Sequence, residues 1–181
     1  TKGVAQHCIF LDSRLQADRF RSKLLDHCLR VSRTLQADPS AEVYVRVDIV
    51  GGGATGVELA AELYNSASEL RHYGLEVFDE SRLKVTLIEA GPRILPALPE
   101  ELATAAHKEL EALGVRVLSV SPGFVRTGMA EEGIASGRTR IEDIVDHTPI
   151  GRLVEPAEVA GVIVRLTDPE FSAVTGSDVL V

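Results

Sequence analysis

The sequence predicts an α/β fold, a Rossmann-like three-layer sandwich with a mainly parallel sheet. Three observations support this prediction. Short apolar runs rich in β-branched residues alternate with longer segments of helical periodicity from about residue 43 onward. A G-x-G-x-x-G motif at residues 51–56 joins the first of these runs directly to a helical pattern. A last helical pattern is followed by a last apolar run at the end of the chain. Such alternation is typical of parallel strands joined by helices.

Length and composition fit one sizeable globular domain. The chain has 181 residues, of which 45% are hydrophobic and 25% are charged, and its net charge is -8. No cluster of basic residues is dense enough to indicate a nucleic-acid partner, and no apolar stretch approaches the length of a membrane span. Cys8 and Cys28 form no C-x-x-C pair, so we expect no metal site and a reducing, cytoplasmic location.

Residues 1–40 are expected to form a lead-in strand and helix. The apolar run at residues 7–11 predicts a short strand. Asp12 or Ser13 is a suitable N-cap for a helix over about residues 14–35. This helix has one apolar face and one basic face. We interpret the basic face as solvated; the alternative is a docking surface for a neighbouring domain.

Residues 41–118 are expected to form the cofactor-binding βαβαβ half. Its strands are predicted near residues 43–50, 83–88 and 115–120, and its helices near 55–70 and 99–113.

The glycine motif lies between the first strand and the first helix of this half. Gly51 would let the chain turn sharply, Gly53 would let a pyrophosphate approach the backbone, and Gly56 would let the helix pack closely on the strand. Free N–H groups at the positive end of the helix would hold the phosphates, so Ala54 and Thr55 join the candidate cofactor-binding residues. The alternative is a glycine-rich turn that binds nothing.

Glu89 closes the second strand and is the candidate ligand of the adenosine ribose. A carboxylate there would accept both ribose hydroxyls and repel a 2′-phosphate. It lies 33 residues after Gly56 (89 − 56), compared with the usual interval of about 20. We attribute the extra length to an excursion over residues 71–81. The alternative is a solvent-exposed glutamate at a strand edge.

Residues 119–181 are expected to complete the same domain. We predict a mobile polar loop over residues 128–140, a helical turn over 141–146, a helix over 156–166 and a final strand over 178–181. Four apolar residues of the longer helix are expected to face inward: Val159, Val162, Ile163 and Leu166.

Two stretches, residues 51–60 and 85–96, resemble the NADH-binding half of type II NADH dehydrogenases, and the resemblance covers about residues 3–118. They are flavoproteins that pass electrons from NADH through FAD to a quinone. The resemblance implies NAD(H) as cofactor. The FAD-binding glycine motif of that family is missing from this sequence, so we expect FAD only if another domain supplies its site.

From about residue 115 to the end, the chain is similar to the C-terminal segment of short-chain dehydrogenases/reductases. The motifs that carry this resemblance are residues 117–127, 148–160 and 174–177. In that family a Pro-Gly loop and a following threonine contact the nicotinamide end of the cofactor, which implies Pro122, Gly123 and Thr127 as site residues. The alternative is a strand-ending turn with a capping threonine. The family's Tyr-x-x-x-Lys is absent, because Tyr64 is followed four residues later by Ser68.

The sequence therefore resembles a chimera of two NAD-using Rossmann proteins, joined within one shared strand. We expect an NAD(H)-binding, oxidoreductase-related domain whose catalytic residues are unknown. One alternative is a fragment of an FAD-dependent NADH:quinone dehydrogenase, and the other is a short-chain reductase. The expected ligand is a dinucleotide. The candidate protein partners are an FAD-binding domain or a second copy of the chain as a homo-oligomer.

Overall fold

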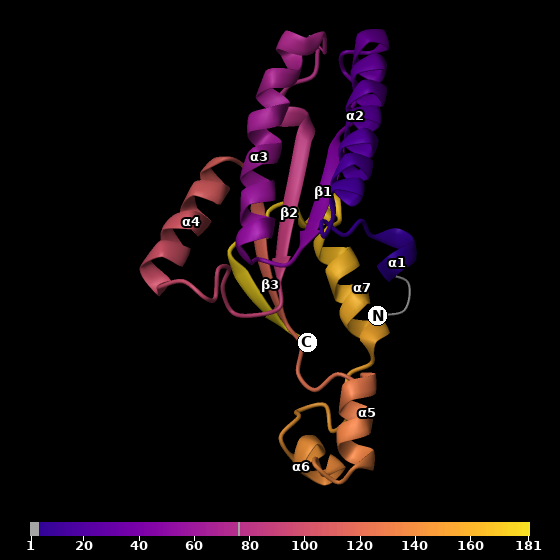
Figure 1. The fold of residues 1–181 in the computed structure, drawn as a ribbon, viewed down its shortest axis with the longest axis vertical. Helices are drawn as coiled ribbons and strands as arrows, with labels where there is room; N and C mark the ends of the chain where they lie inside the picture. Colours follow the sequence, from indigo (N-terminus) through magenta and orange to yellow (C-terminus); the bar gives the residue numbers. More distant parts are fainter. Residues whose placement is uncertain (1–3, 76) are drawn as a thin grey trace. The chain divides into compact units, whose positions relative to one another are not determined.

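A computed structural model of the chain describes residues 4–75 and 77–181 and is drawn in Figure 1. Its strands are β1 (Val45–Val50), β2 (Leu83–Glu89), β3 (Arg116–Ser121) and β4 (Ser177–Leu180). They form one sheet in the order β1-β2-β3-β4. The β3 strand pairs in parallel with β2 and with β4, with Ile88 opposite Leu118 and Val120 opposite Val179. The predicted α/β, Rossmann-like fold class is confirmed.

The helices lie between these strands and before the first one. They are α1 (Val4–His7), α2 (Arg14–Ala37), α3 (Ala54–Leu70), α4 (Glu100–Ala112), α5 (Gly128–Ala135), α6 (Ile141–Asp146) and α7 (Pro156–Leu166). Short 3-10 turns cover Arg71–Tyr73, Glu80–Arg82 and Pro169–Phe171. No helix within the described residues has both the length and the apolar run needed to cross a membrane.

The chain divides into two compact units. The first contains the residues up to Val47 together with Leu63–Lys84, and the second contains Asp48–Glu62 and Val85–Val181. In the first unit the buried side chains come from α2, the second half of α3, the start of β1, the turns before β2 and the first residue of β2. Among them Tyr64 is 8% exposed and its hydroxyl donates to the Leu83 carbonyl at 3.4 Å, which gives this tyrosine a structural role.

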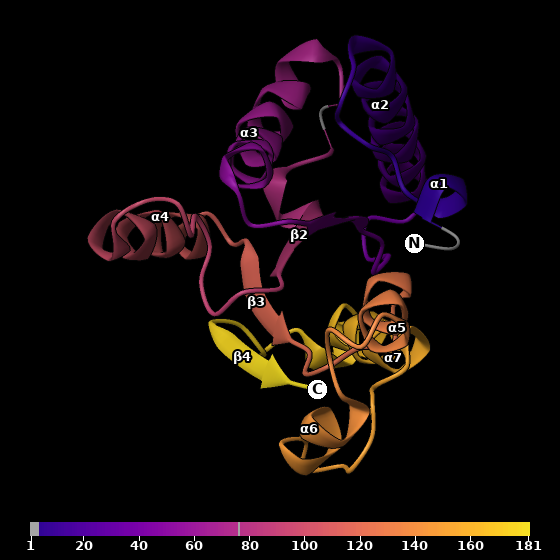
Figure 2. The same ribbon diagram turned by 60° about the horizontal axis from the view of Figure 1, so that its bottom comes forward.

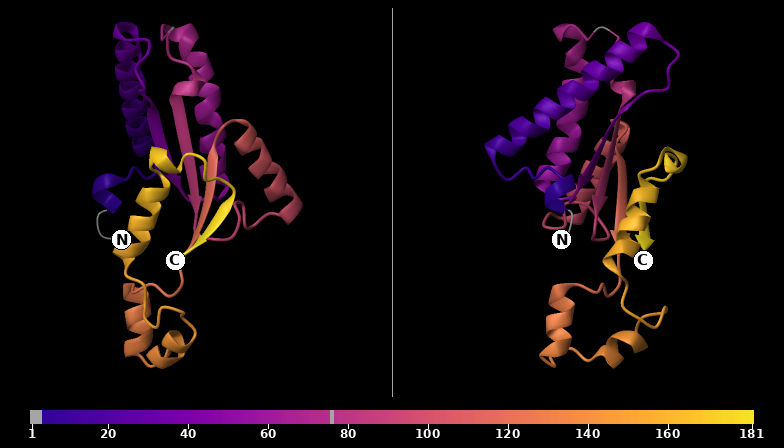
Figure 3. Two further views of the ribbon diagram at one scale, coloured as in Figure 1. Left: turned by 180° about the vertical axis from the view of Figure 1, so that it is seen from behind. Right: turned by 90° about the vertical axis from the view of Figure 1, so that its right-hand side faces the viewer.

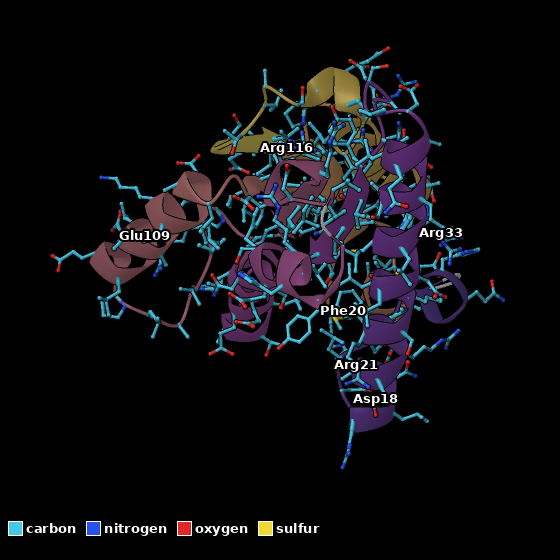
Figure 4. The ribbon with its side chains drawn as sticks, turned by 90° about the horizontal axis from the view of Figure 1, so that it is seen from above. Asp18, Phe20, Arg21, Arg33, Glu109 and Arg116 are labelled. Atoms are coloured by element: carbon cyan, nitrogen blue, oxygen red, sulfur yellow. The ribbon has the colours of Figure 1, made fainter. Side chains whose placement is uncertain are left out.

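Helix α2 begins as predicted, because Ser13 caps it through a hydrogen bond from the Gln16 N–H. Its apolar face is buried near its C-terminal end, around Cys28, Val31 and Leu35. Its basic face is exposed, and Figure 4 shows Asp18 and Arg21 adjoining on it, 3.4 Å apart. Exposure is expected of a solvated face and of a docking surface alike, so both interpretations of this face stay predictions.

The second unit has helices on both faces of its sheet. The residues of α7 that pack on the sheet are those predicted to face inward, and they cover Ile88, Leu118 and Val120. Figure 2 shows α4 and α7 on opposite sides of β3. The connections β2-α4-β3 and β3-α7-β4 both lead toward the same edge of the sheet, but they cross it on opposite faces. The two connections therefore have opposite handedness, whereas nearly all connections between parallel strands are right-handed.

Two predicted elements are wrong. Residues 7–11 do not form a strand: His7 ends α1, and residues 8–11 belong to neither a helix nor a strand of the sheet. Residues 128–140 are not simply a loop, because Gly128–Ala135 form α5, which Figure 3 draws as an orange helix. Thr127 caps α5 by accepting the Ala130 N–H, and helix-forming residues outweigh the two glycines of this segment.

Candidate functional site

The glycine motif forms a tight turn between β1 and α3, as Figure 1 shows. Gly51 has a φ of +116°, a backbone conformation that residues with a Cβ rarely adopt. Its N–H donates to the Ile88 carbonyl at 2.8 Å, which fixes the turn against the end of β2. The first glycine therefore does what the motif predicts, since it turns the chain sharply out of the strand.

Gly56 lies in the first turn of α3 and touches the same turn. A Cβ built on Gly56 would lie 2.0 Å from the Gly51 carbonyl oxygen and 3.4 Å from Ile49. No side chain can occupy that position without a shift of the backbone. The third glycine thus permits close packing of helix on strand, as predicted.

Gly53 differs from the other two because its surroundings are open. It is exposed, and a Cβ built on it would meet no atom within 4 Å. Ala54 and Thr55 are also exposed, and the first turn of α3 carries no acidic side chain that would neutralise the helix N-terminus. The space beside Gly53 and the positive end of α3, whose first turn has no acidic side chain of its own, fit an anionic group such as a pyrophosphate.

Glu89, at the end of β2, holds two loops together. One carboxylate oxygen accepts the Gly52 N–H at 2.6 Å and the other accepts the Gly91 N–H at 2.9 Å. The side chain is half-buried. Each carboxylate oxygen has a further acceptor position, so these bonds leave capacity for hydroxyl donors. Glu89 lies at the strand end predicted from the sequence, whereas its partners Gly52 and Gly91 were not predicted.

Gly52 was not among the predicted site residues, yet it is the most closely surrounded of the motif's first three glycines. It is buried, and a Cβ there would lie 2.9 Å from the Ile94 side chain and 3.0 Å from the Glu89 side chain. Its carbonyl accepts the Leu95 N–H at 2.7 Å. The run of three glycines at residues 51–53 was the sequence signal for this close packing, because a glycine between two motif glycines is itself unusual.

The loop after β2 is held by a bond from β3 and by bonds within the loop itself. The Ser119 hydroxyl of β3 donates to the Gly91 carbonyl. Arg93 donates to the carbonyls of Leu95 at 3.1 Å, Pro96 at 3.2 Å and Leu98 at 3.0 Å. The carboxyl ends of β2 and β3 therefore present a fixed loop next to the glycine turn.

The three residues predicted from the second resemblance follow β3. The Gly123 N–H donates to the Val181 carbonyl at 2.8 Å, so the Pro122–Gly123 turn is tied to the residue after β4. Thr127 is the N-cap of α5, with its hydroxyl oxygen accepting the Ala130 N–H at 3.3 Å. Gly123 and Thr127 are exposed and Pro122 is half-buried. Since the strands are parallel, this turn opens on the same edge of the sheet as the glycine loop.

The segment that carries α5 and α6 is closed at its base. Val125 and Val154 form a parallel bridge, and Arg126 pairs with Glu155 at 2.7 Å. Beside them Arg152 makes two hydrogen bonds of 2.7 Å to Glu158. These bonds, with a further one from a backbone N–H, lower the pKa of the Glu158 carboxyl to about 2. No group of His, Cys, Asp and Glu in the described part of the chain is arranged to hold a metal ion.

Comparison with known proteins agrees with this geometry. Residues 1–122, about two thirds of the chain, match the family model of the pyridine nucleotide-disulphide oxidoreductases. The chain belongs to the pyridine nucleotide-disulphide oxidoreductase family. Residues 97–181 also match the model described as enoyl-(acyl carrier protein) reductase, and the two matches overlap over residues 97–122 around β3. The chimera-like organisation expected from the sequence is therefore confirmed.

The chain is also similar to individual proteins, among them NADH:quinone and NAD(P)H-ubiquinone oxidoreductases. The type II NADH:quinone oxidoreductase of Haemophilus influenzae is 50% identical over 127 residues, which cover 65% of this chain and 29% of that protein. The external alternative NAD(P)H-ubiquinone oxidoreductase B1 of Solanum tuberosum is 29% identical over 74% of this chain and 24% of its own length. The structure of NDH2 from Plasmodium falciparum in complex with NADH has a TM-score of 0.54 at 24% identity, covering 65% of this chain and 24% of that one. The chain thus spans less than a third of each of these proteins.

Proposed function

We propose that the chain is an NAD(H)-binding Rossmann module of the oxidoreductase type. One observation carries the proposal: Gly56 packs α3 against the Gly51 carbonyl, while Gly53 faces open space at the N-terminus of the same helix, whose first turn has no acidic side chain. A glycine turn that binds nothing has no need of both features. Together they fit a pyrophosphate held by backbone N–H groups at a helix start.

Each site residue then has a definite role. The exposed backbone of Gly53, Ala54 and Thr55 holds the pyrophosphate. Glu89 accepts the ribose hydroxyls with the acceptor positions that Gly52 and Gly91 leave free. Because its carboxylate would face a 2′-phosphate as a like charge, NADH is preferred over NADPH.

The nicotinamide end of the cofactor is assigned to the turn after β3. Pro122, Gly123 and Thr127 follow a strand whose carboxyl end opens on the same edge as the glycine loop. The Thr127 hydroxyl already accepts one hydrogen bond and can still donate its own proton. This is the group we assign to the carboxamide side of the cofactor.

Hydride transfer also needs an acceptor held against the nicotinamide. The second candidate function, one half of a flavin-dependent NADH dehydrogenase, is favoured by the 50% identity to a type II NADH:quinone oxidoreductase. In that case a separate FAD-binding domain supplies the flavin, which is the hydride acceptor. A carbonyl reductase is disfavoured, because the chain lacks a Tyr-x-x-x-Lys proton donor. We therefore expect dinucleotide binding with little turnover by this chain alone.

Two assays test this proposal. Titration of NADH against the wild type and Gly53→Val should show that the valine variant binds about 10- to 100-fold more weakly, because a branched side chain fills the open space beside Gly53. Equal binding of NADH by both proteins would show that the pyrophosphate does not bind beside Gly53. NADH oxidation is then followed with a quinone, with a carbonyl compound and with added FAD, and robust turnover without flavin would contradict the second part of the proposal.

A further inference from the structure

The loop after β2 has one side chain that interacts with backbone alone. Arg93 is half-buried, and its guanidinium donates to three carbonyls in the turn over residues 95–98. Within this turn the Leu98 N–H donates to the Leu95 carbonyl at 2.9 Å. The planar, multidentate guanidinium can satisfy several convergent carbonyls at once, which an ammonium group does less well.

The turn that Arg93 holds contains an unusual backbone conformation. Leu95 has a φ of 49°, and it is the single residue other than glycine with a positive φ among the described residues. A bulky residue adopts that conformation when its surroundings fix it. Here they do so on both sides, since its carbonyl accepts Arg93 and Leu98 while its N–H donates to Gly52.

The bond from Leu95 to Gly52 determines where the next N–H of the glycine loop points. The Gly52 carbonyl and the Gly53 N–H belong to one planar trans peptide unit, so they point in opposite directions. With the carbonyl directed at the Leu95 N–H, 2.7 Å away, the Gly53 N–H is directed to the other side of the loop. The Gly52 N–H is already occupied by Glu89. The Gly51 N–H donates to the Ile88 carbonyl, so Gly53 offers the first N–H of the loop that is taken by neither Ile88 nor Glu89.

We propose that Arg93 is a positioning residue for the pyrophosphate site. By holding the 95–98 turn, it keeps the Leu95 N–H on the Gly52 carbonyl, which in turn aims the Gly53 N–H at the anion. Arg93 itself needs no contact with the cofactor. This inference rests on the proposed function of the glycine loop, and it adds the loop after β2 as a working part of that site.

The first test compares Arg93→Met with a matched control. Arg140→Met removes the same charge from an exposed arginine whose nearest carboxylate, Glu142, is 3.7 Å away. Titration with NADH should show about 10- to 100-fold weaker binding for Arg93→Met, the effect of misdirecting one charge-assisted bond, and an unchanged affinity for Arg140→Met. Equal affinity of Arg93→Met and wild type would overturn the proposal.

The second test separates positioning from general stability. ADP carries a pyrophosphate and adenosine does not, so Arg93→Met should weaken competition by ADP and leave competition by adenosine unchanged. Equal losses for both ligands would show that Arg93 merely supports the fold. Arg93→Lys keeps the charge and part of the donor set, and it should recover part of the ADP affinity. If Arg93→Met fails to fold, the same ADP and adenosine comparison on Arg93→Lys decides the question.

The third measurement needs no ligand. Amide hydrogen exchange at Leu95 should be slow in the wild type, because its N–H is bonded to Gly52, and clearly faster in Arg93→Lys or Arg93→Met. Unchanged hydrogen exchange at the Leu95 amide would show that Arg93 does not hold the Leu95 N–H on the Gly52 carbonyl. A wild type that binds no NADH would overturn the proposed function and this inference together, whereas normal wild-type binding with an unaffected Arg93→Met would overturn this inference alone.

Discussion

Replacement of Gly56 by alanine tests the closest contact in the protein that involves the glycine motif. A Cβ at this position would lie 2.0 Å from the Gly51 carbonyl oxygen, and contacts under 3.0 Å are essentially never seen for real Cβ atoms. The start of α3 and the end of β1 would therefore have to separate by about 1 Å. That shift would strain the hydrogen bond from the Gly51 N–H to the Ile88 carbonyl.

The expected loss of stability follows from two opposing effects. Overpacking of this kind costs about 1–3 kcal/mol or more, and here the clash is with backbone, which adapts poorly. The better helix propensity of alanine returns at most about 1 kcal/mol. We expect Gly56→Ala to lower the free energy of unfolding by about 2 kcal/mol and the Tm by about 4–8 °C for a chain of this size.

Gly53→Ala is the matched control, since it adds the same methyl group three residues earlier where nothing lies within 4 Å. Gly53 immediately precedes α3, and its carbonyl accepts the Val57 N–H, so alanine there costs about 1 kcal/mol or less. Urea unfolding followed by circular dichroism measures both variants. A Gly56→Ala variant within about 0.5 kcal/mol of the wild type would refute the close packing of α3 on the turn.

Three further predictions concern single side chains. Glu89→Gln should narrow the preference for NADH over NADPH, because the like charge facing a 2′-phosphate is removed; a wild type that binds both cofactors equally would show that the ribose assignment is wrong. Since hydrogen bonds from Arg152 lower the pKa of Glu158 from 4.5 to about 2, the stabilisation lost in Glu158→Gln should be constant above about pH 5 and disappear as the pH falls toward 2, as acid-dependent unfolding of both proteins would show. Burial raises the pKa of the Cys28 thiol to about 11, so a thiol reagent at pH 8 should modify exposed Cys8 at once and Cys28 at the rate of unfolding; two equally fast thiols would contradict the packing of α2.

Local signals predicted most of the secondary structure. Helix α7 runs from Pro156 to Leu166 as expected, because a proline at its first position and a capping glutamate mark its start. Gly114, with a φ of +92°, follows α4, in the position where a glycine commonly ends a helix. Such signals lie within a few residues of the element that they define.

The wrong or missed features depend on contacts between distant parts of the chain. The hydrogen bond from Gly52 to Glu89 joins residues 37 apart, and that from Ser119 to Gly91 joins residues 28 apart. The local sequence around these residues predicts neither bond. The apolar run at residues 7–11 had the composition of a strand, but composition does not decide pairing, which depends on contacts with distant residues. Thr127 differs from these cases. A capping role was one of its two predicted roles, but the helix that it caps, α5, was predicted to be a loop.

The pairing of β3 on both sides bears on the order in which the sheet assembles. Its register with β2 joins Thr86 to Arg116, 30 residues apart (116 − 86), and its register with β4 joins Leu118 to Ser177, 59 residues apart (177 − 118). Doubling a loop adds only about 0.6 kcal/mol of closure entropy, so length alone does not separate the two events. Burial does, because β2 is almost entirely buried whereas three of the four residues of β4 are exposed. The β2-α4-β3 unit should therefore form the folding nucleus, and β4 should join it late and be the first strand to fray.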